Sequence, residues 1–138
     1  MHRTAIRDMQ PEELAEVEAF SKPALGCACA LVALTESKIV GYVEMAPTFF
    51  QRDFVSLLSV RPEHRRQGVA TALMKTMETR CQGEKLFTST NLSNSSMQAL
   101  LGKLGYQLCG IIEELDEGDP ELIFVKHLTG SPQPATTE

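Results

Sequence analysis

The sequence has no tryptophan, and only 6% of its 138 residues are aromatic. It also lacks any apolar run approaching the roughly 20 residues that a membrane-spanning helix requires, which argues against a transmembrane protein. Residues 1–5 lack the apolar stretch of a secretory signal, so we expect no export signal there. What is present, 43% hydrophobic and 22% charged residues, is typical of a soluble globular chain, and the length favours a single domain.

Metal-binding patterns are also missing. The four cysteines, Cys27, Cys29, Cys81 and Cys109, form no C-x-x-C pair, and the chain has only three histidines. A zinc site needs three or four such ligands at suitable spacing, so we expect no metal centre. Scattered thiols without an export signal indicate small buried side chains in a reducing compartment, and we expect the protein to be cytoplasmic.

The chain lacks an excess of basic residues. Its 18 Asp and Glu against 13 Lys and Arg give a net charge of −5, which argues against nucleic acid or an anionic membrane as a partner. The charges cluster, because three arginines and His64 lie within 61–66 and six carboxylates lie within 113–121. We expect His64 to be an exposed loop residue. A nucleic-acid interface built on the arginines is a weaker interpretation, because a short loop suits one compact phosphate group better than an extended backbone.

Hydrophobic periodicity and turn residues predict strands and helices between residues 3 and 128. Strands are expected at 3–8, 28–35, 38–46, 53–60, 86–90, 106–115 and 121–128. Helices are expected at 11–20, from Gly68 to about Cys81, and from a cap at Ser93 or Asn94 to Leu104. Pro47 is expected to end its strand or interrupt its pairing. Residues 1–128 then form one domain, and residues 129–138, without core side chains, form a disordered tail.

The segment 57–73 carries the most specific chemical pattern. It reads as a buried strand, a basic loop and a helix that begins at Gly68. The start of a helix exposes unpaired N–H groups and the positive end of the helix dipole, which together bind phosphate oxygens. Gly68 and the small Ala70 let the backbone approach such a ligand. Thr71 can add a hydroxyl donor, and Arg65 or Arg66 can supply a positive charge opposite to that of the phosphate.

This segment resembles the signature of the Gcn5-related N-acetyltransferase (GNAT) family. The run R-R-Q-G-V-A at 65–70 matches the family's pattern of Arg or Gln, two residues, Gly, one residue, and Gly or Ala. The P-loop and dinucleotide-binding patterns do not fit, because no Gly-Lys-Ser/Thr run is present and Gly68 stands alone. Asn94, Ala99 and the Leu-Gly-Tyr run at 104–106 match residues that the family often has downstream, and the predicted elements follow the family's order.

The resemblance implies an α+β protein with the single-domain GNAT fold, in which helices flank a mixed, mostly antiparallel sheet whose central strands splay apart. It implies acetyl-CoA as the cosubstrate, with backbone groups of 58–60 pairing with its pantetheine amides. It also implies a hydrogen bond from Asn94 to the pantetheine or phosphate portion. The candidate cofactor-binding residues are therefore Leu58, Ser59, Val60, Arg65, Arg66, Gln67, Gly68, Val69, Ala70, Thr71 and Asn94.

The sequence departs from the family at the usual general acid. Many members have a tyrosine in the last helix that protonates the leaving thiolate, but Leu101 stands at that position, on the apolar side of the helix. We expect Tyr106 to be a core residue instead. A thiolate is a tolerable leaving group without an acid, because a thiol has a pKa of about 8.5. The candidate base is Glu44, acting directly or through water, and a solvent-facing strand glutamate is the alternative interpretation.

These features predict an acetyl-CoA-dependent N-acetyltransferase, in which a neutral amine attacks the thioester and a backbone N–H near Val60 holds the oxyanion. The main alternative is a catalytically inactive module that binds CoA as a sensor or regulator, because the usual tyrosine is missing. The acceptor, a primary amine of a small molecule or peptide, cannot be read from the sequence. The acidic residues 113–121 can attract a cationic amine or form a solvated hairpin tip. A homodimer is left open.

Overall fold

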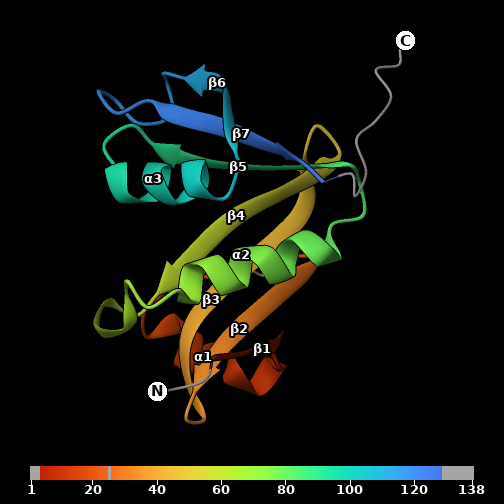
Figure 1. Cartoon of the computed structure of the whole chain (residues 1–138), viewed down its shortest axis with the longest axis vertical. Helices are drawn as coiled ribbons and strands as arrows, with labels where there is room; N and C mark the ends of the chain where they lie inside the picture. The colour runs from red at the N-terminus through yellow and green to blue at the C-terminus, as the bar shows by residue number, and fades with distance from the viewer. Residues whose placement is uncertain (1–3, 25, 129–138) are drawn as a thin grey trace.

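Seven strands form a single sheet in the described part of the chain, and helices pack on it (Figure 1). The structure, a computed structural model, describes residues 4–24 and 26–128. The strands are β1 (Thr4–Asp8), β2 (Cys29–Thr35), β3 (Lys38–Phe49), β4 (Arg52–Val60), β5 (Lys85–Asn91), β6 (Gln107–Ile112) and β7 (Glu121–His127). The helices are α1 (Leu14–Glu18), α2 (Val69–Arg80) and α3 (Ser95–Lys103), with 3-10 turns η1 (Pro11–Glu13) and η2 (Pro62–His64). Within these residues, no helix has the length and apolar character needed to cross a membrane.

The two central strands of the sheet separate along their length. The strand order is β1-β2-β3-β4-β5-β7-β6, and every neighbouring pair is antiparallel except β4 and β5. β4 and β5 are parallel and pair only at Phe54 with Phe87 and at Val55 with Thr88. Beyond these pairs the strands diverge, as Figure 1 shows, so residues 56–60 have no β5 partner in the described part. The expected α+β architecture, with a mixed, mostly antiparallel sheet and splayed central strands, is confirmed.

A β-bulge in β4 marks the point of divergence. Glu44 of β3 pairs with Leu57, but the next residue, Met45, pairs with Val55, so Ser56 is the extra residue on β4. A bulge bends its strand and increases the local twist. The bulge therefore lies directly after the last β4–β5 pair, where β4 turns away from β5.

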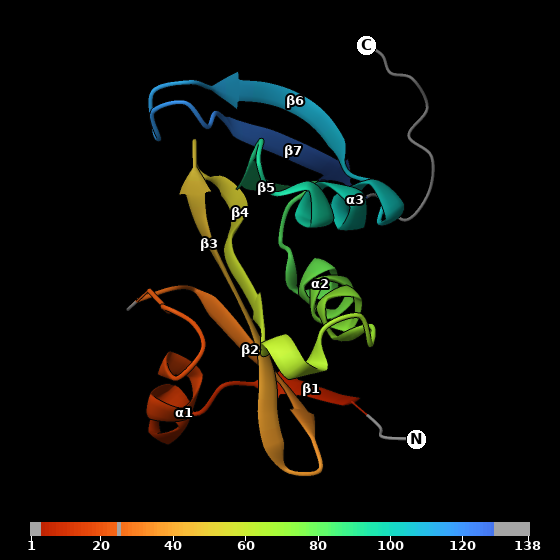
Figure 2. The same ribbon diagram turned by 90° about the vertical axis from the view of Figure 1, so that its left-hand side faces the viewer.

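Helices cover both faces of the sheet, with α2 and α3 on one face and α1 on the other (Figure 2). The main core between α2 and the sheet includes Leu31, Val43, Leu73, Met74 and Met77. The smaller cluster beneath α1 consists of Val17, Val32, Ile39 and Tyr42. The buried residues of α2, Val69, Leu73, Met74 and Met77, recur at the three- and four-residue spacing of one helical face and pack in this core.

Of the two outcomes expected at Pro47, the structure shows the second: the strand continues, but its pairing with β4 is interrupted. β3 continues to Phe49, with Ala46 opposite Phe54 and Phe49 opposite Arg52, and the irregular pairing between them contains the proline. The pairing with β2 stops at Cys29 and Met45. Past that point β3 is an edge strand on the β2 side, so the missing N–H of Pro47 breaks no ladder hydrogen bond there.

Two other boundaries differ from the prediction. The first helix, expected at 11–20, is the 3-10 turn η1 followed by only five residues of α1. Glu13 accepts a hydrogen bond from the Gln10 backbone N–H and two from Arg7, which holds this start as a tight turn. β6 ends at Ile112 instead of 115, because the chain bends into the acidic turn. The tail predicted at 129–138 lies outside the described residues.

Candidate functional site

A cavity of about 600 Å³ opens where β4 leaves β5, between the end of β4 and the starts of α2 and α3. It is lined by Phe20, Leu58, Ser59, Val60, His64, Arg65, Arg66, Gly68, Val69, Ala70, Thr71, Asn94, Ser96, Met97 and Leu100. All of the predicted cofactor-binding residues except Gln67 are in this set, and Gln67 is exposed. The fold thus brings together residues from β4, the following loop, α2 and α3. Which atoms of these residues would contact a cofactor stays a prediction.

The cavity also has a wall that the sequence analysis missed. Ser96, Met97 and Leu100 continue the first turns of α3 after Asn94, so the helical spacing could have indicated them. Phe20, which follows α1, had no such signal, because it lies almost 40 residues before β4's end in the chain. The segment after α1 is held there by a hydrogen bond of 2.7 Å between the hydroxyl groups of Ser21 and Ser59.

The loop before α2 has the conformation that anion binding requires. Gly68 is the N-cap of α2, with a φ of +82°, and Arg66 before it also has a positive φ of +63°. The Ala72 N–H bonds to the Gly68 carbonyl at 3.0 Å, which begins the helical ladder. The N–H groups of the preceding residues, Val69–Thr71, come before the ladder starts and have no partner within the helix. They are therefore available to a ligand in the cavity.

The basic cluster at 61–66 divides into two roles. Arg61 does not line the cavity; its Nε donates to the Ile39 carbonyl at 2.7 Å, and its guanidinium lies 4.7 Å from the centre of the Phe20 ring. Arg65 and Arg66 line the cavity, and Arg65 Nε donates to the Val60 carbonyl at 3.2 Å. Arg65 and Arg66 therefore line the cavity, while Arg61 connects the loop to β3.

His64 is not the exposed loop residue that the sequence predicted. It is half-buried, lines the cavity, and its Nδ1 is shielded from solvent without a hydrogen-bond partner in the described residues. His64 is the last residue of the 3-10 turn η2, which leads from β4 into the loop beside the cavity.

Asn94 caps α3 in the manner predicted from the sequence. Its side-chain oxygen accepts a hydrogen bond from the Met97 N–H at 3.1 Å. Because the oxygen is used by the cap, the amide nitrogen is the atom that Asn94 can offer as a donor to a ligand. Its predicted hydrogen bond with the cofactor would therefore run from Nδ2.

Glu44 is buried, with 2% of its surface exposed, so the alternative of a solvent-facing strand glutamate is wrong. Its carboxylate accepts three hydrogen bonds: from the Ala24 N–H at 2.9 Å, from the Tyr42 hydroxyl at 2.8 Å and from the Ser56 hydroxyl at 2.8 Å. The donors come from the segment after α1, from β3 and from the bulge of β4. Burial and the bond to Glu44 raise the pKa of Tyr42 far above its usual range, so its phenol stays protonated.

Leu101 and Tyr106 are both core residues, as the sequence predicted. Leu101 is fully buried, and Tyr106 donates its hydroxyl proton to Glu78 at 2.8 Å. Burial, followed by the bond to Glu78, raises the pKa of Tyr106 well above its usual value. Neither residue lines the cavity.

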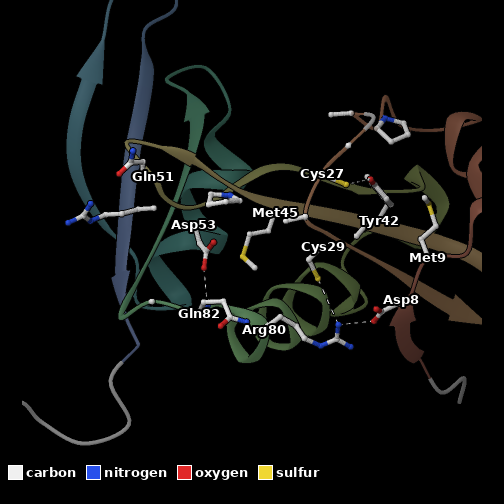
Figure 3. Close-up of a pocket in the computed structure, with 18 of the residues that line it drawn as sticks. Asp8, Met9, Cys27, Cys29, Tyr42, Met45, Gln51, Asp53, Arg80 and Gln82 are labelled. Carbon is white, nitrogen blue, oxygen red and sulfur yellow. Dashed lines mark hydrogen bonds and ion pairs between the residues drawn. The ribbon is translucent and has the colours of Figure 1, made fainter.

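A second and larger cavity, of about 1300 Å³, was not predicted (Figure 3). It lies where the long β3–β4 hairpin projects beyond β2, and its walls include Asp8, Cys29, Met45 and Arg80. Arg80 forms an ion pair of 2.8 Å with Asp8 and points toward Cys29, as Figure 3 shows. Tyr42 also lines this cavity, and its hydroxyl donates a hydrogen bond to Glu44. The Glu44 carboxylate itself does not line the cavity. No sequence signal indicated this cavity, because short pieces of many elements contribute to it.

The acidic residues 113–121 also have two roles. Asp116 accepts a hydrogen bond from the Asn91 side chain at 3.0 Å, and Asp119 accepts two from Ser93, at 2.6 and 2.9 Å. These carboxylates hold the turn against the β5–α3 connection. Glu113, Glu114 and Glu117 are exposed, which leaves their charge to act on solutes. In the part of the chain that the structure describes, no three metal-ligating side chains are grouped as a metal site.

Comparison with known proteins shows which family has this fold. The model of the acetyltransferase (GNAT) family matches residues 3–106. A GNAT-family acetyltransferase from Bacillus cereus has 28% identity and a TM-score of 0.80, with 91% of this chain and 97% of that chain covered. No protein of curated function was found to match.

Two more distant structures share the fold. Nourseothricin acetyltransferase has 18% identity and a TM-score of 0.78, covering 91% of this chain and 98% of its own. The ribosomal-protein-S18-alanine N-acetyltransferase from Escherichia coli has 14% identity and a TM-score of 0.77, covering 98% and 100%. Because the family model spans most of the sequence, this chain belongs to the GNAT family of acetyltransferases, enzymes that take the acetyl group from acetyl-CoA.

Proposed function

We propose that the protein transfers the acetyl group of acetyl-CoA to a primary amine of a small molecule or peptide by direct attack. The amine nitrogen forms a bond to the thioester carbonyl carbon, the carbon–sulfur bond breaks, and CoA leaves as the thiolate. The observation that supports this most is the cavity itself, which joins the unpaired part of β4 to the start of α2.

Two regions of the cavity suit two neighbouring parts of the cofactor, the pyrophosphate and the pantetheine arm. The N–H groups at the start of α2, with Arg65 and Arg66 beside them, suit the pyrophosphate. Leu58, Ser59 and Val60 have no β5 partner, so their backbone groups can pair with the pantetheine amides as an added strand would. A backbone N–H from this unpaired stretch would hold the oxyanion.

We assign Glu44 the role of the general base, acting through Ser56. Glu44 lines neither cavity, so it does not reach an amine directly. Ser56 also lines neither cavity, but it is exposed at the bulge where β4 leaves β5, and its hydroxyl donates to Glu44 at 2.8 Å. As the amine attacks, Ser56 would take its proton and pass its own hydroxyl proton to the carboxylate. The loss of the usual tyrosine then affects only the leaving thiolate.

The exposed carboxylates of 113–117 favour a cationic acceptor. Together with the net charge of −5, they would attract a protonated amine toward the β6–β7 turn. The two distant structures are named for nourseothricin and for the alanine of ribosomal protein S18, so both acceptors belong in a test.

Thiol release from acetyl-CoA, measured with a panel of amines, tests the proposal. The panel contains a polyamine, nourseothricin and a peptide with an N-terminal alanine, and mass spectrometry checks each product for an added acetyl group. Calorimetry measures acetyl-CoA binding separately. Turnover with one class supports the proposal and names the acceptor. Tight acetyl-CoA binding without turnover on any amine supports the alternative, a CoA-binding sensor.

A further inference from the structure

The face of the sheet opposite α2 and α3 carries polar side chains where the central strands diverge. Leu86 of β5 and Leu122 and Phe124 of β7 belong to the main core, and successive strand residues point to opposite faces. Ser89 of β5 and Glu121 of β7, each an odd number of residues away from these, therefore lie on the other face. Of the described helices only α1 is on that face, and Figure 2 shows it at the β1–β2 end of the sheet.

Two serines occupy matching positions on the diverging strands. Val55 and Thr88 form the last β4–β5 pair, and Ser56 and Ser89 are the next residue on each strand. Because neighbouring strands lie about 4.8 Å apart, the two serines are separated by little more than this distance. Ser56 is exposed and Ser89 is partly exposed, so a solute can reach this side of both strands.

Each serine is hydrogen-bonded to a carboxylate from the strand on its outer side. Ser56 donates to Glu44 of β3 at 2.8 Å, and Ser89 donates to Glu121 of β7 at 2.6 Å. Glu44 lies on the same face of the sheet, because it is two residues from Tyr42, which packs in the cluster beneath α1. The point of divergence therefore has a hydroxyl–carboxylate pair on both sides, and only the Glu44 pair takes part in the proposed proton transfer.

The Glu121 carboxylate forms no ion pair within the described part of the chain, where Ser89 is its side-chain donor. Asn91, directly opposite Glu121 in the β5–β7 ladder, donates its amide to the Asp116 carboxylate and the Asp119 carbonyl instead. A carboxylate has about four acceptor positions, so one neutral donor leaves Glu121 able to accept more hydrogen bonds. A positively charged donor forms the strongest of these.

We propose that Glu121 binds a second ammonium group of the acceptor, which makes the acceptor a diamine. This inference rests on the proposed amine transfer at Ser56. One amine of the substrate lies at Ser56, loses its proton toward Glu44 and attacks the thioester, while the other keeps its proton and donates to Glu121. The strand spacing and the bond from Ser89 place the two nitrogens about 5–8 Å apart, which a chain of about three or four methylene groups spans.

The kcat/KM values of two amines of equal chain length test this assignment, because diaminobutane has the second ammonium group and butylamine lacks it. Glu121→Gln should lower kcat/KM for diaminobutane about tenfold, mainly through KM, since a charged hydrogen bond to the bound substrate is lost. It should leave kcat/KM for butylamine unchanged. The matched control is Glu84→Gln, which removes the same charge at an exposed residue before β5 and should change neither value at physiological ionic strength.

Calorimetry of diaminobutane binding to the CoA-bound enzyme gives a readout that needs no turnover. Glu121→Gln should raise this Kd about tenfold, and Glu84→Gln should leave it unchanged. An unchanged Kd in Glu121→Gln overturns the proposal, as does an equal loss of kcat/KM for both amines, which would assign Glu121 to proton transfer or folding. If diaminobutane binds as expected but no amine is acetylated, the proposed transfer is wrong, although Glu121 remains a diamine-binding residue.

Discussion

Glu44 is a buried carboxylate at the point where three segments of the chain meet. Burying a carboxylate is costly unless hydrogen bonds replace its water, and here Ala24, Tyr42 and Ser56 supply them. Since Ala24 belongs to the segment that also brings Phe20 to the cavity, the carboxylate positions a wall of the site as well as the bulge. Its proposed part in proton transfer must be separated experimentally from this positioning.

Replacing Glu44 with Gln should lower kcat by about 10²–10⁴-fold, the usual contribution of a general base, with the Kd for acetyl-CoA nearly unchanged. Ser56→Ala should lower kcat by at least about tenfold, because it removes the proposed relay. Tyr42→Phe is the control: it removes another hydrogen bond to the same carboxylate but leaves the Ser56 path intact. Steady-state kinetics and calorimetry measure these effects. If Tyr42→Phe is as damaging as Ser56→Ala, Glu44 is a positioning residue and not the base.

Gly68 stands at the start of α2 with a left-handed conformation. No atom outside its chain neighbours lies within 4 Å of the place a Cβ would take, so within the protein itself only the φ of +82° favours glycine. Gly68→Val should cost about 1–2 kcal/mol in stability and should weaken acetyl-CoA binding, because the side chain would stand between backbone and phosphate.

Gly118→Val is the matched control for this change. Gly118 has a similar φ of +76° and equally open surroundings, but it lies in the β6–β7 turn. It should lose similar stability in a thermal melt while keeping its acetyl-CoA affinity in calorimetry. A folded Gly68→Val variant with unchanged affinity would remove Gly68 from the cofactor site.

At the scale of elements, the closeness of α2 to β3 depends on Gly41. A Cβ at this position would lie 2.8 Å from Val69 Cγ1 and 2.9 Å from Leu73 Cδ1, closer than real contacts allow. Gly41→Val should therefore push the start of α2 from the sheet, costing about 1–3 kcal/mol and weakening acetyl-CoA binding. Gly102→Ala, at an open position in α3, should instead stabilise by about 0.5–1 kcal/mol. Denaturant unfolding measures the change in stability, and calorimetry measures acetyl-CoA binding. Unchanged acetyl-CoA affinity in Gly41→Val would show that α2 adjusts to the larger side chain.

α2 is also joined to the far half of the sheet by a polar contact. Glu78 accepts the Tyr106 hydroxyl at 2.8 Å and forms an ion pair of 3.1 Å with Lys126 of β7. Tyr106→Phe should cost about 1.5–3 kcal/mol in stability, the usual value for a hydrogen bond to a charged group, but turnover should stay within a few-fold. A loss of turnover near a hundredfold would instead identify Tyr106 as the missing general acid.

At the scale of the whole molecule, negative charge is concentrated at the β6–β7 turn. Changing Glu113, Glu114 and Glu117 to Gln should lower kcat/KM for a cationic amine at low salt, because the attraction acts on the encounter. The effect should fade as salt is raised, since the screening length is about 8 Å at physiological ionic strength. Acetyl-CoA affinity should not change. Equal kcat/KM at low salt would show that the turn is only a solvated tip.

The sequence by itself determined the parts of the protein that depend on neighbouring residues. The run at 65–70 predicted the loop and the start of α2, because the need for a glycine at positive φ is local. The order of strands and helices followed from periodicity, and the cap of α3 was narrowed to Ser93 or Asn94 from their place before an apolar helix, of which Asn94 is the cap. These signals were enough to indicate the family, and all of the predicted cofactor-binding residues except Gln67 line the smaller cavity.

The tertiary structure decided what depends on residues distant in the chain. Glu44 looked like a surface glutamate because its donors Ala24 and Ser56 lie 20 and 12 residues away. Pro47 continues its strand because β2 ends beside it, and the larger cavity exists only where several elements meet. Burial and hydrogen-bond partners are properties of the packed molecule, and no periodicity within one segment encodes them.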